Sequence, residues 1–589
     1  MVSLQDPRSG FEVAQVKRWR TVQTDAQAAA ALAAATGLPR PLAALLASRG
    51  HATAEAVERF RRPRLAELSD PAALPNMPQA VARVWRALER GERIVVHGDY
   101  DADGVTSAAL LLRVLRRLGG QAEGFLPRRI EDGYGLSPDT ARRCTEELRA
   151  GLIVTVDCGS GAADAVRAAA AAGVDVVVTD HHELAGAPAP AAALVNPKLD
   201  ADPALHTLAG IGVAFKFCHA LLKEGRSRGC PAAAEIDLRD YLDLVAIGTI
   251  ADVAPLTGEN RALVSHGLQR LPATRNPGLR ALLAQTGLSG ELSPYHVAFV
   301  LGPRLNAAGR IGSAEAALGL LLTEDDDEAR QLAERLERDN AERRRIEDGI
   351  RQEAEAELDA GFDARAHFGL VAARAGWHPG AIGIVASRLC AKYYRPAVVI
   401  ALQPDGRGRG SARSIPAVHL LAALHDCADL LENYGGHAAA AGLQIRAEHL
   451  EAFRRRFNEA CAQRLTPADL TPVQDVDVWL TLGDVNEKLW QEMRALRPFG
   501  YGNPEPVWGV RGVRAVGTPR RLGENGAHLA LTLSDGTVQC DAIGFNLGGA
   551  TLPSGKLDVL FHLDKNTFRD KTSLRLKLQD FAAPGVQPG

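Results

Sequence analysis

The chain has 589 residues, of which 46% are hydrophobic and 24% are charged, and its formal net charge is −3. The length predicts about four domains at roughly 150 residues each, and the composition is typical of a soluble globular protein. The nearly neutral charge excludes a uniformly basic nucleic-acid-binding surface, so any such surface must be a local basic groove. Apolar runs stay below the roughly 18 residues of a membrane span. From these short runs we expect no membrane association. The eight cysteines are scattered without a C-x-x-C pair, so we expect a protein of the reducing cytoplasm.

Residues 1–75 are rich in Ala and Arg and are predicted to form a helical N-terminal segment without a chemical motif. From about residue 93 to 196, apolar β-branched stretches alternate with helical periodicity. We predict strands at Ile94–His97, Leu152–Val156, Val174–Val178 and Ala192–Val195, and helices at Val105–Leu118 and 162–172. Fully apolar strands that alternate with helices predict a parallel sheet covered on both faces. Ligands of such sheets collect beyond the carboxyl ends of the strands.

The pattern changes twice in the second half of the chain. Asp325 to about Leu358 is highly charged, with no Pro and one Gly, and predicts one long connector helix. A second α/β pattern follows from about 366 to 463, with strands at Phe368–Ala372 and Ala397–Ala401 and a Gly/Arg loop at 404–414. Beyond about 472, short alternating strands predict a small antiparallel barrel or sandwich. These strands are Leu529–Leu533, Val538–Phe545, Leu557–Leu563 and Leu574–Leu578.

Acidic residues and histidines follow three of the predicted strands. The segments are His97-Gly-Asp99-Tyr-Asp101-Ala-Asp103-Gly104, Asp157-Cys158-Gly159 and Asp180-His181-His182, and Asp252 ends the apolar segment 247–251. Carboxylates packed within a few ångströms repel unless cations neutralise them. Mixed carboxylate and imidazole ligands suit Mn²⁺ or Mg²⁺ better than structural zinc. Two ions about 3.5–4 Å apart could share Asp157, clamp a phosphate and activate water.

An Asp or Gly after a strand is also an ordinary turn or helix-cap residue. At any single position this structural interpretation is as good as a metal ligand. Four clusters in series, each closing an apolar segment, favour a metal site instead.

The segments HGDYDADG, VDCG, TDHH and GTIADVAP resemble the four motifs of the DHH phosphoesterase superfamily. The resemblance is closest to the RecJ family of exonucleases and extends from about residue 76 over nearly the whole chain. It implies two divalent metal ions, Mn²⁺ or Mg²⁺. One ion is then held by His97, Asp101 and Asp157, and the other by Asp103, Asp157, His181 and Asp252. His182 and Asp99 are assigned catalytic roles, with His182 near the scissile phosphate, and Asp180 is expected either to orient a histidine or to cap a turn.

The resemblance also implies an α/β architecture of joined modules. After the N-terminal segment 1–75, a parallel-sheet DHH domain (76–312) is joined by a connector helix (313–360) to a DHH-associated α/β domain (361–466). A small OB-like β-barrel (467–585) that binds nucleic acid follows.

Two segments predict contacts with substrate phosphates. Gly302-Pro-Arg304-Leu-Asn306-Ala-Ala-Gly309-Arg310 resembles a stretch beside the active site of the family, where Arg310 and Asn306 act on the substrate and Arg304 binds it. Guanidinium groups match phosphate geometry and stabilise transferring charge, although the stretch is also compatible with a capping turn.

In the second α/β domain, the Gly/Arg loop and the segment Gly435-Gly436-His437 suit anion binding. By resemblance, the substrate-binding residues there are Arg413, Ser414, Gly435, Gly436 and His437. Ala412 replaces a glycine that is common in the family pattern, which weakens the case for a backbone contact at that position.

The segment Leu496–Pro506 is similar to the lead-in motif of the barrel attached to RecJ proteins. Aromatic side chains that could stack on bases are Phe499, Tyr501, Trp508 and Phe568, and cations that could follow a backbone are Arg569, Lys571, Arg575 and Lys577. Trp508 and Phe499 could equally fill the barrel core.

The leading hypothesis is metal-dependent hydrolysis of single-stranded DNA. The resemblance implies an exonuclease that works from 5′ to 3′, releases mononucleotides in DNA repair and recombination, and has a helicase and a single-strand-binding protein as candidate partners. Two alternatives remain: a superfamily member that cleaves short oligonucleotides or cyclic dinucleotides, and a non-catalytic single-strand-binding scaffold. Filled metal-ligand positions argue against the scaffold, and the additional barrel argues against the short substrates.

Overall fold

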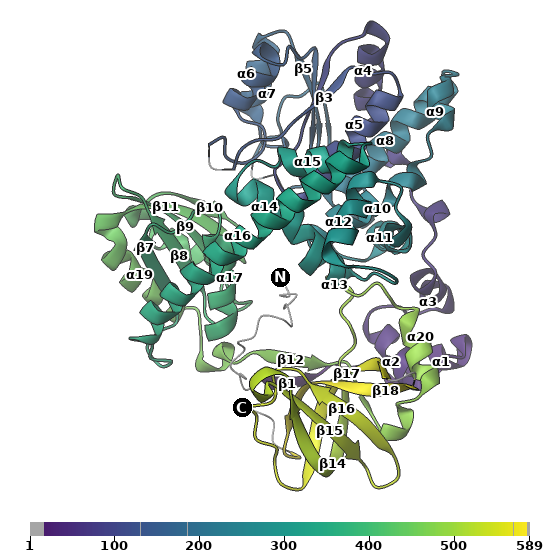
Figure 1. Cartoon of the computed structure of the whole chain (residues 1–589), viewed down its shortest axis with the longest axis vertical. Coiled ribbons are helices and arrows are strands. Elements are labelled where there is room, and N and C mark those ends of the chain that lie inside the picture. Colours follow the sequence, from purple (N-terminus) through teal and green to yellow (C-terminus); the bar gives the residue numbers. More distant parts are fainter. Residues whose placement is uncertain (1–16, 130, 185, 569–570, 586–589) are drawn as a thin grey trace. The chain divides into compact units, whose positions relative to one another are not determined.

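The structure is a computed structural model that describes residues 17–129, 131–184, 186–568 and 571–585. Contacts divide the chain into two compact units. Of the described residues, those within 63–348 and 498–503 form the first unit, and those within 17–62, 349–497 and 504–585 form the second. Helix α16 (Asp326–Asp359) runs from the first unit into the second as one long helix (Figure 1), which confirms the helix predicted from the charged stretch.

The first unit is built on a five-stranded parallel sheet with the strand order β3-β2-β4-β5-β6. The strands are β2 (Ile94–His97), β3 (Ala122–Phe125), β4 (Leu152–Val156), β5 (Asp175–Thr179) and β6 (Ala193–Val195). Side chains alternate between two apolar clusters, so that Val95 and Ile153 pack on one face and Val96 and Val154 on the other. Both faces are therefore buried, as the apolar strands predict.

Helices cover the two faces of this sheet (Figure 1). One face carries α4 (Met77–Arg90), α5 (Ala102–Arg117) and α8 (Gly210–Ser227), and the other carries α6 (Pro138–Glu146) and α7 (Ala163–Ala171). The remaining helices are α9 (Pro231–Glu235), α10 (Leu242–Ala251), α11 (Gly258–Arg270), α12 (Pro277–Thr286), α13 (Pro294–His296), α14 (Gly302–Ile311) and α15 (Glu315–Leu322). Strand β3 was not predicted, because its sequence, Ala-Glu-Gly-Phe, forms a half-exposed edge strand without an apolar run.

The chain reverses direction across the sheet between β2 and β4, because β3 lies on one side of β2 while β4, β5 and β6 lie on the other. In open parallel sheets, this switch point leaves a crevice at the carboxyl ends of the two central strands. His97 ends β2 and Asp157 directly follows β4, so the topology brings two of the predicted motifs to the crevice.

The second unit contains a five-stranded mixed sheet with the order β10-β11-β9-β8-β7. Its strands are β7 (Leu370–Ala375), β8 (Ala397–Leu402), β9 (Arg407–Arg413), β10 (Leu431–Gly436) and β11 (Ala440–Arg446), and its helices are α17 (Ile382–Tyr393), α18 (Leu420–His425) and α19 (Leu450–Ala462). Only β7 and β8 pair in parallel within this sheet. The predicted α/β character is confirmed.

The predicted Gly/Arg loop at 404–414 is wrong over Arg407–Arg413, which is the central strand β9. Its buried positions are Gly408, Gly410 and Ala412, and its arginines alternate with them. A Cβ at Gly410 would lie 2.6 Å from Leu443 Cδ1, so a neighbouring side chain fills the space above the glycine. Buried and more exposed positions alternate along β9 with a period of two. Because two of the buried positions are glycines, which have no apolar side chain, a hydrophobicity pattern does not detect this alternation.

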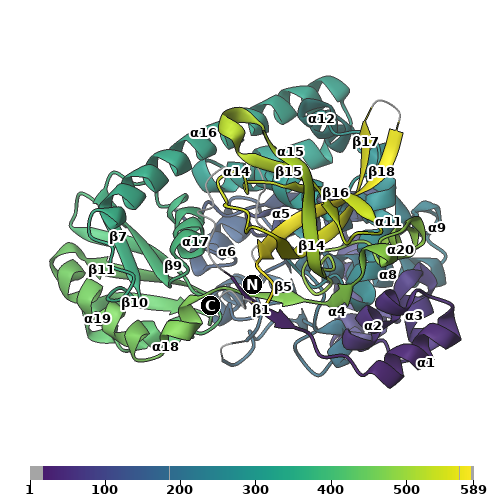
Figure 2. The same ribbon diagram turned by 90° about the horizontal axis from the view of Figure 1, so that it is seen from below.

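The C-terminal barrel of the second unit has the order β13-β14-β15-β16-β18-β17 and closes through pairing of β14 with β17. The strands are β13 (Val478–Leu480), β14 (Trp508–Leu522), β15 (His528–Ser534), β16 (Gln539–Gly544), β17 (Lys556–Phe568) and β18 (Lys571–Ala582), and helix α20 (Glu487–Arg494) lies between β13 and β14 in the chain. Figure 2 shows β17 and β18 side by side as a long hairpin. The barrel is not purely antiparallel, since β16 pairs in parallel with β18 and β13 with β14. Strand β14 was missed because Arg, Gly and Pro interrupt its apolar pattern.

The N-terminal segment is helical over α1 (Ala26–Thr36), α2 (Arg40–Ser48) and α3 (Ala54–Arg61). Residues Arg18–Thr21 instead form strand β1, which pairs in parallel with β12 (Val473–Val476). Trp19 Nε1 also donates a hydrogen bond of 2.8 Å to Asp580. These partners lie more than 450 residues away, so local sequence could not predict this strand.

Among the described residues, no single helix has the length and apolar character to cross a bilayer, although α1 and α2 pass such a test as a pair bent by 119°.

The glycine positions of β9 lead to a stability prediction. We expect Gly410→Ala to lower the free energy of unfolding by about 1–3 kcal/mol, because the added Cβ overpacks against Leu443. The control is Gly442→Ala on the neighbouring strand β11, where the nearest heavy atom would be 3.9 Å away. Thermal unfolding followed by circular dichroism measures both variants. Equal midpoints for the two would contradict the packing described here.

Candidate metal centre

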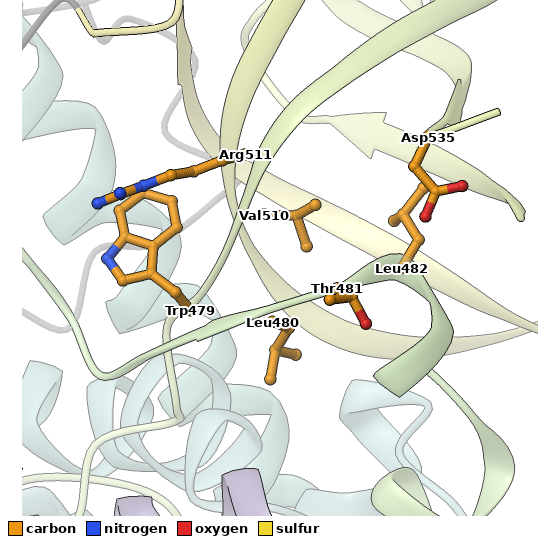
Figure 3. Close-up of a pocket in the computed structure, with 7 residues that line it drawn as sticks. All are labelled: Trp479, Leu480, Thr481, Leu482, Val510, Arg511 and Asp535. Atoms are coloured by element: carbon orange, nitrogen blue, oxygen red, sulfur yellow. The ribbon is translucent and has the colours of Figure 1, made fainter. Parts of the chain in front are cut away.

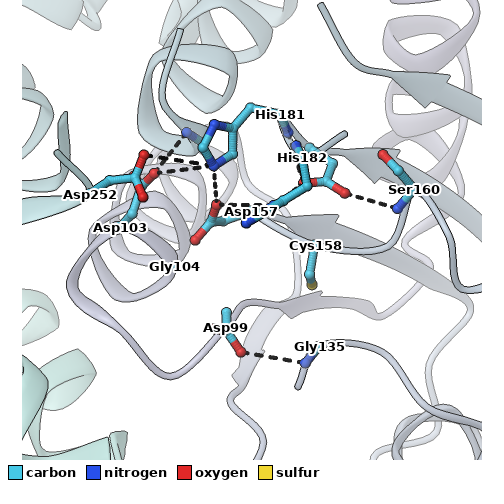
Figure 4. A network of polar contacts seen from close by, with 12 residues as sticks. Asp99, Asp103, Gly104, Gly135, Asp157, Cys158, Ser160, His181, His182 and Asp252 are labelled. Atoms are coloured by element: carbon cyan, nitrogen blue, oxygen red, sulfur yellow. Dashed lines mark hydrogen bonds and ion pairs between the residues drawn. The ribbon is translucent and has the colours of Figure 1, made fainter. Parts of the chain in front are cut away.

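The site lies at the carboxyl edge of the parallel sheet in the first unit. Figure 4 shows Asp103, Asp157, His181 and Asp252 turned toward one another. Asp103 comes from the first turn of α5, Asp157 follows β4, His181 follows β5, and Asp252 follows α10. Four segments that are well separated in sequence therefore converge, as the four motifs predict.

His181 lies at the centre of this group. Its Nε2 is 3.1 Å from Asp157 Oδ1, 3.9 Å from Asp252 Oδ2 and 4.0 Å from Asp103 Oδ2. Two sets of three side chains bring their ligand atoms within 4.8 Å of one another: Asp103 with His181 and Asp252, and Asp157 with His181 and His182. Each set could hold a cation.

The electrostatics of the cluster fit divalent cations. Burial and the charges of neighbouring aspartates raise the pKa of Asp157 and Asp252 well above the usual value, and raise the pKa of Asp103 to about 7. Burial lowers the pKa of His181 to about 4, so its ring is neutral at neutral pH. Asp157 Oδ1 and His181 Nε2 are both buried without a hydrogen-bond partner among the described residues. A cation between these atoms would satisfy both and relieve the repulsion.

Close backbone approach shapes this part of the site. The amides of Gly210 and Ile211, at the N-terminus of α8, donate hydrogen bonds of 2.7 and 2.8 Å to the two Asp103 oxygens. A Cβ at Gly210 would overlap Asp157 Oδ1, and one at Gly248 would lie 2.9 Å from Asp103 Oδ1. Only glycine leaves room for the carboxylates at these positions. The contribution of α8 was not predicted, because backbone amides leave no motif in the sequence.

Asp180 takes both of the roles expected for it, because it orients His182 and also caps the turn by accepting hydrogen bonds of 2.7 and 3.2 Å from the amides of His181 and His182. Asp180 Oδ1 lies 2.8 Å from His182 Nδ1, and Asp180 Oδ2 accepts a hydrogen bond from the Ser160 amide. Burial would raise the pKa of Asp180, but the contact with His182 and the Ser160 amide hold it below the usual value. Likewise, burial would lower the pKa of His182, but Asp180 raises it. His182 is thereby fixed beside the cluster while its side chain stays 44% exposed.

Tyr134 is a site residue that sequence reasoning missed. Its hydroxyl lies 3.1 Å from His182 Nδ1 and donates a hydrogen bond of 3.2 Å to the Asp157 carbonyl. Gly133 and Gly135 flank it, both with positive φ, and form the turn that presents the ring. The sequence Gly133-Tyr134-Gly135 could have indicated this residue, because two glycines around a tyrosine are typical of a tight turn.

The remaining residues of the first motif take different places. His97 is fully buried, with Nε2 3.3 Å from Thr140 Oγ1 and Nδ1 3.8 Å from Cys158 Sγ. Asp101 caps α5 by accepting hydrogen bonds from the amides of Asp103 and Gly104. Asp99 is buried, and burial together with the charge of Asp101 raises its pKa to about 8. These three residues lie outside the two sets of three described above, so their roles as ligands or catalysts stay predictions.

The segment Gly302–Arg310 is the helix α14 rather than a capping turn. Asn306 Oδ1 accepts a hydrogen bond of 2.7 Å from the Ala102 amide, and a Cβ at Gly309 would lie 2.5 Å from the Tyr100 carbonyl oxygen. Helix α14 thus supports the loop that carries Asp101 and Asp103.

The two arginines of α14 differ in their surroundings. Arg304 is buried and donates hydrogen bonds to Glu337 and to the Val300 carbonyl, at 2.5 and 2.6 Å. Arg310 is partly exposed and lies close enough to Tyr100 to lower the pKa of that phenol, although burial raises it overall to about 12. Contacts of Asn306, Arg304 and Arg310 with substrate stay predictions.

The second unit contains the other predicted substrate-binding residues. Arg413 ends β9 and donates to the Ala412 carbonyl and Ser411, Ser414 Oγ donates to the Val418 carbonyl, and Gly435, Gly436 and His437 lie at the end of β10 and in the turn after it. Ala412 is fully buried in the sheet, so its methyl group faces the core. The substitution at 412 therefore leaves the outward face of β9 unchanged.

The barrel decides between the two alternatives stated for Trp508. Trp508 is fully buried and belongs to the core, so it has no surface for a base. Arg575 is paired with Asp564 at 2.9 Å, and Lys577 lies over the Phe545 ring. Arg569 lies outside the described residues, and the structure does not describe the side chains of Phe568 and Lys571.

An aromatic site that the sequence did not indicate lies elsewhere on the barrel. The Arg511 guanidinium stacks 4.2 Å from the centre of the Trp479 ring, at a hollow between β13 and β14 (Figure 3). The hollow is completed by Leu480, Thr481, Leu482, Val510 and Asp535.

Three stretches of the chain match known families. Residues 93–249 match the DHH family, N-terminal domain, residues 367–463 match the DHHA1 domain, and residues 476–580 match the RecJ OB domain. Together with the parallel sheet and its carboxylate–imidazole cluster, these matches define a protein of the DHH class.

Comparison with individual proteins shows which family within this class the chain belongs to. The chain is 37% identical over 577 residues to the single-stranded-DNA-specific exonuclease RecJ of Bacillus subtilis (strain 168), with 97% of this chain and 71% of that protein covered. It is also similar to the crystal structure of RecJ in complex with Mn²⁺ from Thermus thermophilus, with a TM-score of 0.82 and 34% identity over 97% of this chain and 80% of that chain. The Mg²⁺ complex of RecJ from the same organism gives a TM-score of 0.76 and 33% identity, covering 97% and 79%. The chain belongs to the RecJ family.

Because charges crowd around Asp157, we expect the substitution Asp157→Asn to raise thermal stability without metal and to lower the stabilisation that metal provides. Asp157→Asn keeps a residue that tolerates the positive φ of 60° at this position and can donate a hydrogen bond to His181 Nε2. At mildly alkaline pH without metal, we expect the variant to unfold at a higher temperature than the wild type, because a repelling charge is gone. Mn²⁺ at about 100 times its dissociation constant should stabilise the wild type by roughly 2.7 kcal/mol and the variant much less.

Differential scanning fluorimetry with Mn²⁺ and with chelator measures both effects. The control is Asp164→Asn, a side chain 82% exposed on α7, which should behave as the wild type. An Asp157→Asn protein that gains as much from Mn²⁺ as the wild type would contradict the assignment of Asp157 as a ligand.

Proposed function

We propose that this protein is a divalent-cation-dependent exonuclease that hydrolyses phosphodiester bonds of single-stranded DNA. The observation that carries the proposal is the buried cluster in which Asp157 Oδ1 and His181 Nε2 face each other at 3.1 Å, neither with a hydrogen-bond partner in the part of the chain that the structure describes. Such a cluster suits Mn²⁺ or Mg²⁺, and the relatives with which the chain shares its family are named for this activity. Membership in the RecJ family and the cluster therefore point to the same chemistry.

The chemistry divides between the ions and the protein. When bound, divalent cations polarise a phosphate oxygen and lower the pKa of water. Hydrolysis then forms one bond from a water oxygen to phosphorus and breaks the bond to the leaving sugar oxygen, which takes up a proton. Asp103, Asp157, His181 and Asp252 hold one ion in this proposal, and His97, Asp101 and Asp157 hold the other.

The other side chains of the site bind and orient the phosphate. His182, fixed by Asp180, is available to donate a hydrogen bond to a phosphate oxygen beside the cluster. Arg310 supplies a guanidinium from α14, and preorganised donors of this kind stabilise the charge that develops in phosphoryl transfer. Asn306 acts through the loop amide whose hydrogen bond it accepts, and Asp99 acts within the same loop.

The finer features of the proposal rest on the resemblance to the RecJ family, and the location rests on the scattered cysteines. They are digestion from 5′ to 3′ with release of mononucleotides, a role in DNA repair and recombination, a cytoplasmic location, and a helicase and a single-strand-binding protein as partners. The strand would also contact Arg413, Ser414, Gly435, Gly436 and His437. The motif adds Arg304 to these contacts, but its buried guanidinium already donates to Glu337 and the Val300 carbonyl, so we expect its main role to be structural. The stretch that matches the RecJ OB domain favours long strands over dinucleotides, because a dinucleotide requires no strand-tracking module.

Digestion of end-labelled DNA tests the activity and its direction. With Mn²⁺ and a long single strand labelled at one terminus, we expect early loss of a 5′ label and late loss of a 3′ label. Chelator should abolish digestion, and a duplex should be resistant. Early loss of the 3′ label would contradict the direction, a preference for two- to four-nucleotide substrates would favour the short-substrate alternative, and binding without cleavage would favour a scaffold.

Substitution of the two arginines of α14 tests which of them contacts the substrate. We expect Arg310→Lys to lower kcat/KM by about 10- to 100-fold, because a lysine cannot reproduce bidentate phosphate binding. Arg304→Lys should mainly lower the thermal midpoint, since it breaks the contacts with Glu337 and Val300. Steady-state kinetics and thermal melts separate the two. If Arg304→Lys lost turnover at an unchanged midpoint, the substrate contact would belong to Arg304 instead.

A further inference from the structure

The segment Pro498–Asn503 clusters by its contacts with the first unit, although the residues on both sides of it belong to the second. It is a closed turn in which the amides of Gly500 and Asn503 each donate to the other residue's carbonyl, at 2.9 and 3.1 Å. Asn503 is 1% exposed, and its Nδ2 donates a hydrogen bond of 2.9 Å to the Pro498 carbonyl. The turn is therefore held in one conformation by its own hydrogen bonds.

This Pro498–Asn503 loop contacts the residues that directly follow Asp252. The Tyr501 carbonyl accepts a hydrogen bond of 2.7 Å from the Leu256 amide. Gly502 packs against Pro255, so that a Cβ at position 502 would lie 3.0 Å from Pro255 Cβ. Arg261, 2% exposed on α11, donates to the Pro498 carbonyl at 3.4 Å. Contacts at both ends of the loop thus fix it beside the motif that carries Asp252.

The backbone after Asp252 needs such support. Val253 has a φ of +59°, a left-handed conformation that is a genuine outlier for a β-branched residue. Strained residues of this kind persist where the surrounding structure over-determines them. On one side, the amides of Val253 and Ala254 bond to carbonyls of the last turn of α10. On the other side, Asn260 donates to the Pro255 carbonyl, and the Leu256 amide bonds to the loop.

We propose that the Pro498–Asn503 loop is a positioning element for Asp252, which it holds in reach of Asp103 and His181. Asp252 Oδ2 lies 3.9 Å from His181 Nε2, at the side of the cluster opposite Ser160 in Figure 4. Release of the loop lets the Val253 turn relax and moves this carboxylate away from the other ligands, which weakens cation binding. The polypeptide that leads into the barrel thereby also supports the cation site. The inference rests on the cation-binding part of the proposed function and is independent of the nucleic-acid substrate.

Gly502→Ala tests the loop with a minimal change. Gly502 has a φ of +75° and packs on Pro255, so an alanine there both strains the backbone and pushes the loop from its place. The matched control is Gly91→Ala, with a φ of +67° and no heavy atom within 4 Å, which carries the backbone strain alone. Titration of the full chain with Mn²⁺, with free ion measured by electron paramagnetic resonance, reads the affinity directly. We expect Gly502→Ala to raise the dissociation constant about tenfold or more, as changes around metal ligands commonly do, and Gly91→Ala to leave it unchanged.

A double-mutant cycle shows whether the effect passes through Asp252. In an Asp252→Asn background, Gly502→Ala should weaken Mn²⁺ binding no further, since coupled residues are not additive. Asn503→Ala, which opens the turn without adding atoms, should act in the same direction as Gly502→Ala and serves if that variant fails to fold.

The outcomes separate this inference from the function on which it rests. Wild-type affinity in both loop variants, or an equal loss with and without Asp252, would overturn the positioning role alone. A wild-type chain that binds no Mn²⁺ would overturn the cation site and the inference with it. A wild-type chain that binds Mn²⁺ but digests no single-stranded DNA would overturn the proposed nuclease activity alone, and the loop's role would still be decided by the Mn²⁺ affinities of the variants.

Discussion

The mutual repulsion of aspartates around His181 is the constraint on which the site depends. Asp103 and Asp157 are buried, Asp252 is a quarter exposed, and Asp103 raises the pKa of both of the others. Carboxylates at this spacing in a dry environment stay charged only when cations share their oxygens. The apolar strands and helices that enclose the cluster therefore create both the repulsion and the affinity for divalent ions.

The scaffold brings these charges together through backbone geometry. The switch point of the sheet sets the ends of β2 and β4 side by side, and the N-terminus of α8 directs two amides at Asp103. A helix N-terminus favours a carboxylate electrostatically, which partly offsets the repulsion from its neighbours. Gly210 and Gly248 admit this approach because any side chain there would occupy the carboxylates' space. Asp157 itself adopts a left-handed conformation that few other residue types tolerate.

Supporting residues matter here as much as ligands. Asp180 fixes His182, Asn306 fixes the amide of Ala102 between two motif aspartates, and the Pro498–Asn503 loop fixes the turn after Asp252. Each of these contacts joins segments distant in sequence or secures a turn at the end of an element. Ligand geometry in metal sites depends on such outer contacts, so in this chain they restrict the positions of carboxylates that repel one another.

The sequence alone determined the metal-type motifs and the order of the modules, because apolar strands followed by Asp and His leave a local signal. It also determined the parallel sheet and the long helix α16, whose periodicity and charge are visible residue by residue. The tertiary structure decided what local patterns could not contain. Strands β9 and β14 contain glycine and arginine at positions that interrupt an apolar pattern. Strand β1 forms by pairing with the distant strand β12, and Trp508 packs in the barrel core. The amides of α8, the hydroxyl of Tyr134 and the loop beside Pro255 join the site for the same reason: their contributions arise from contacts between distant segments, which a linear sequence does not specify by spacing or hydrophobicity.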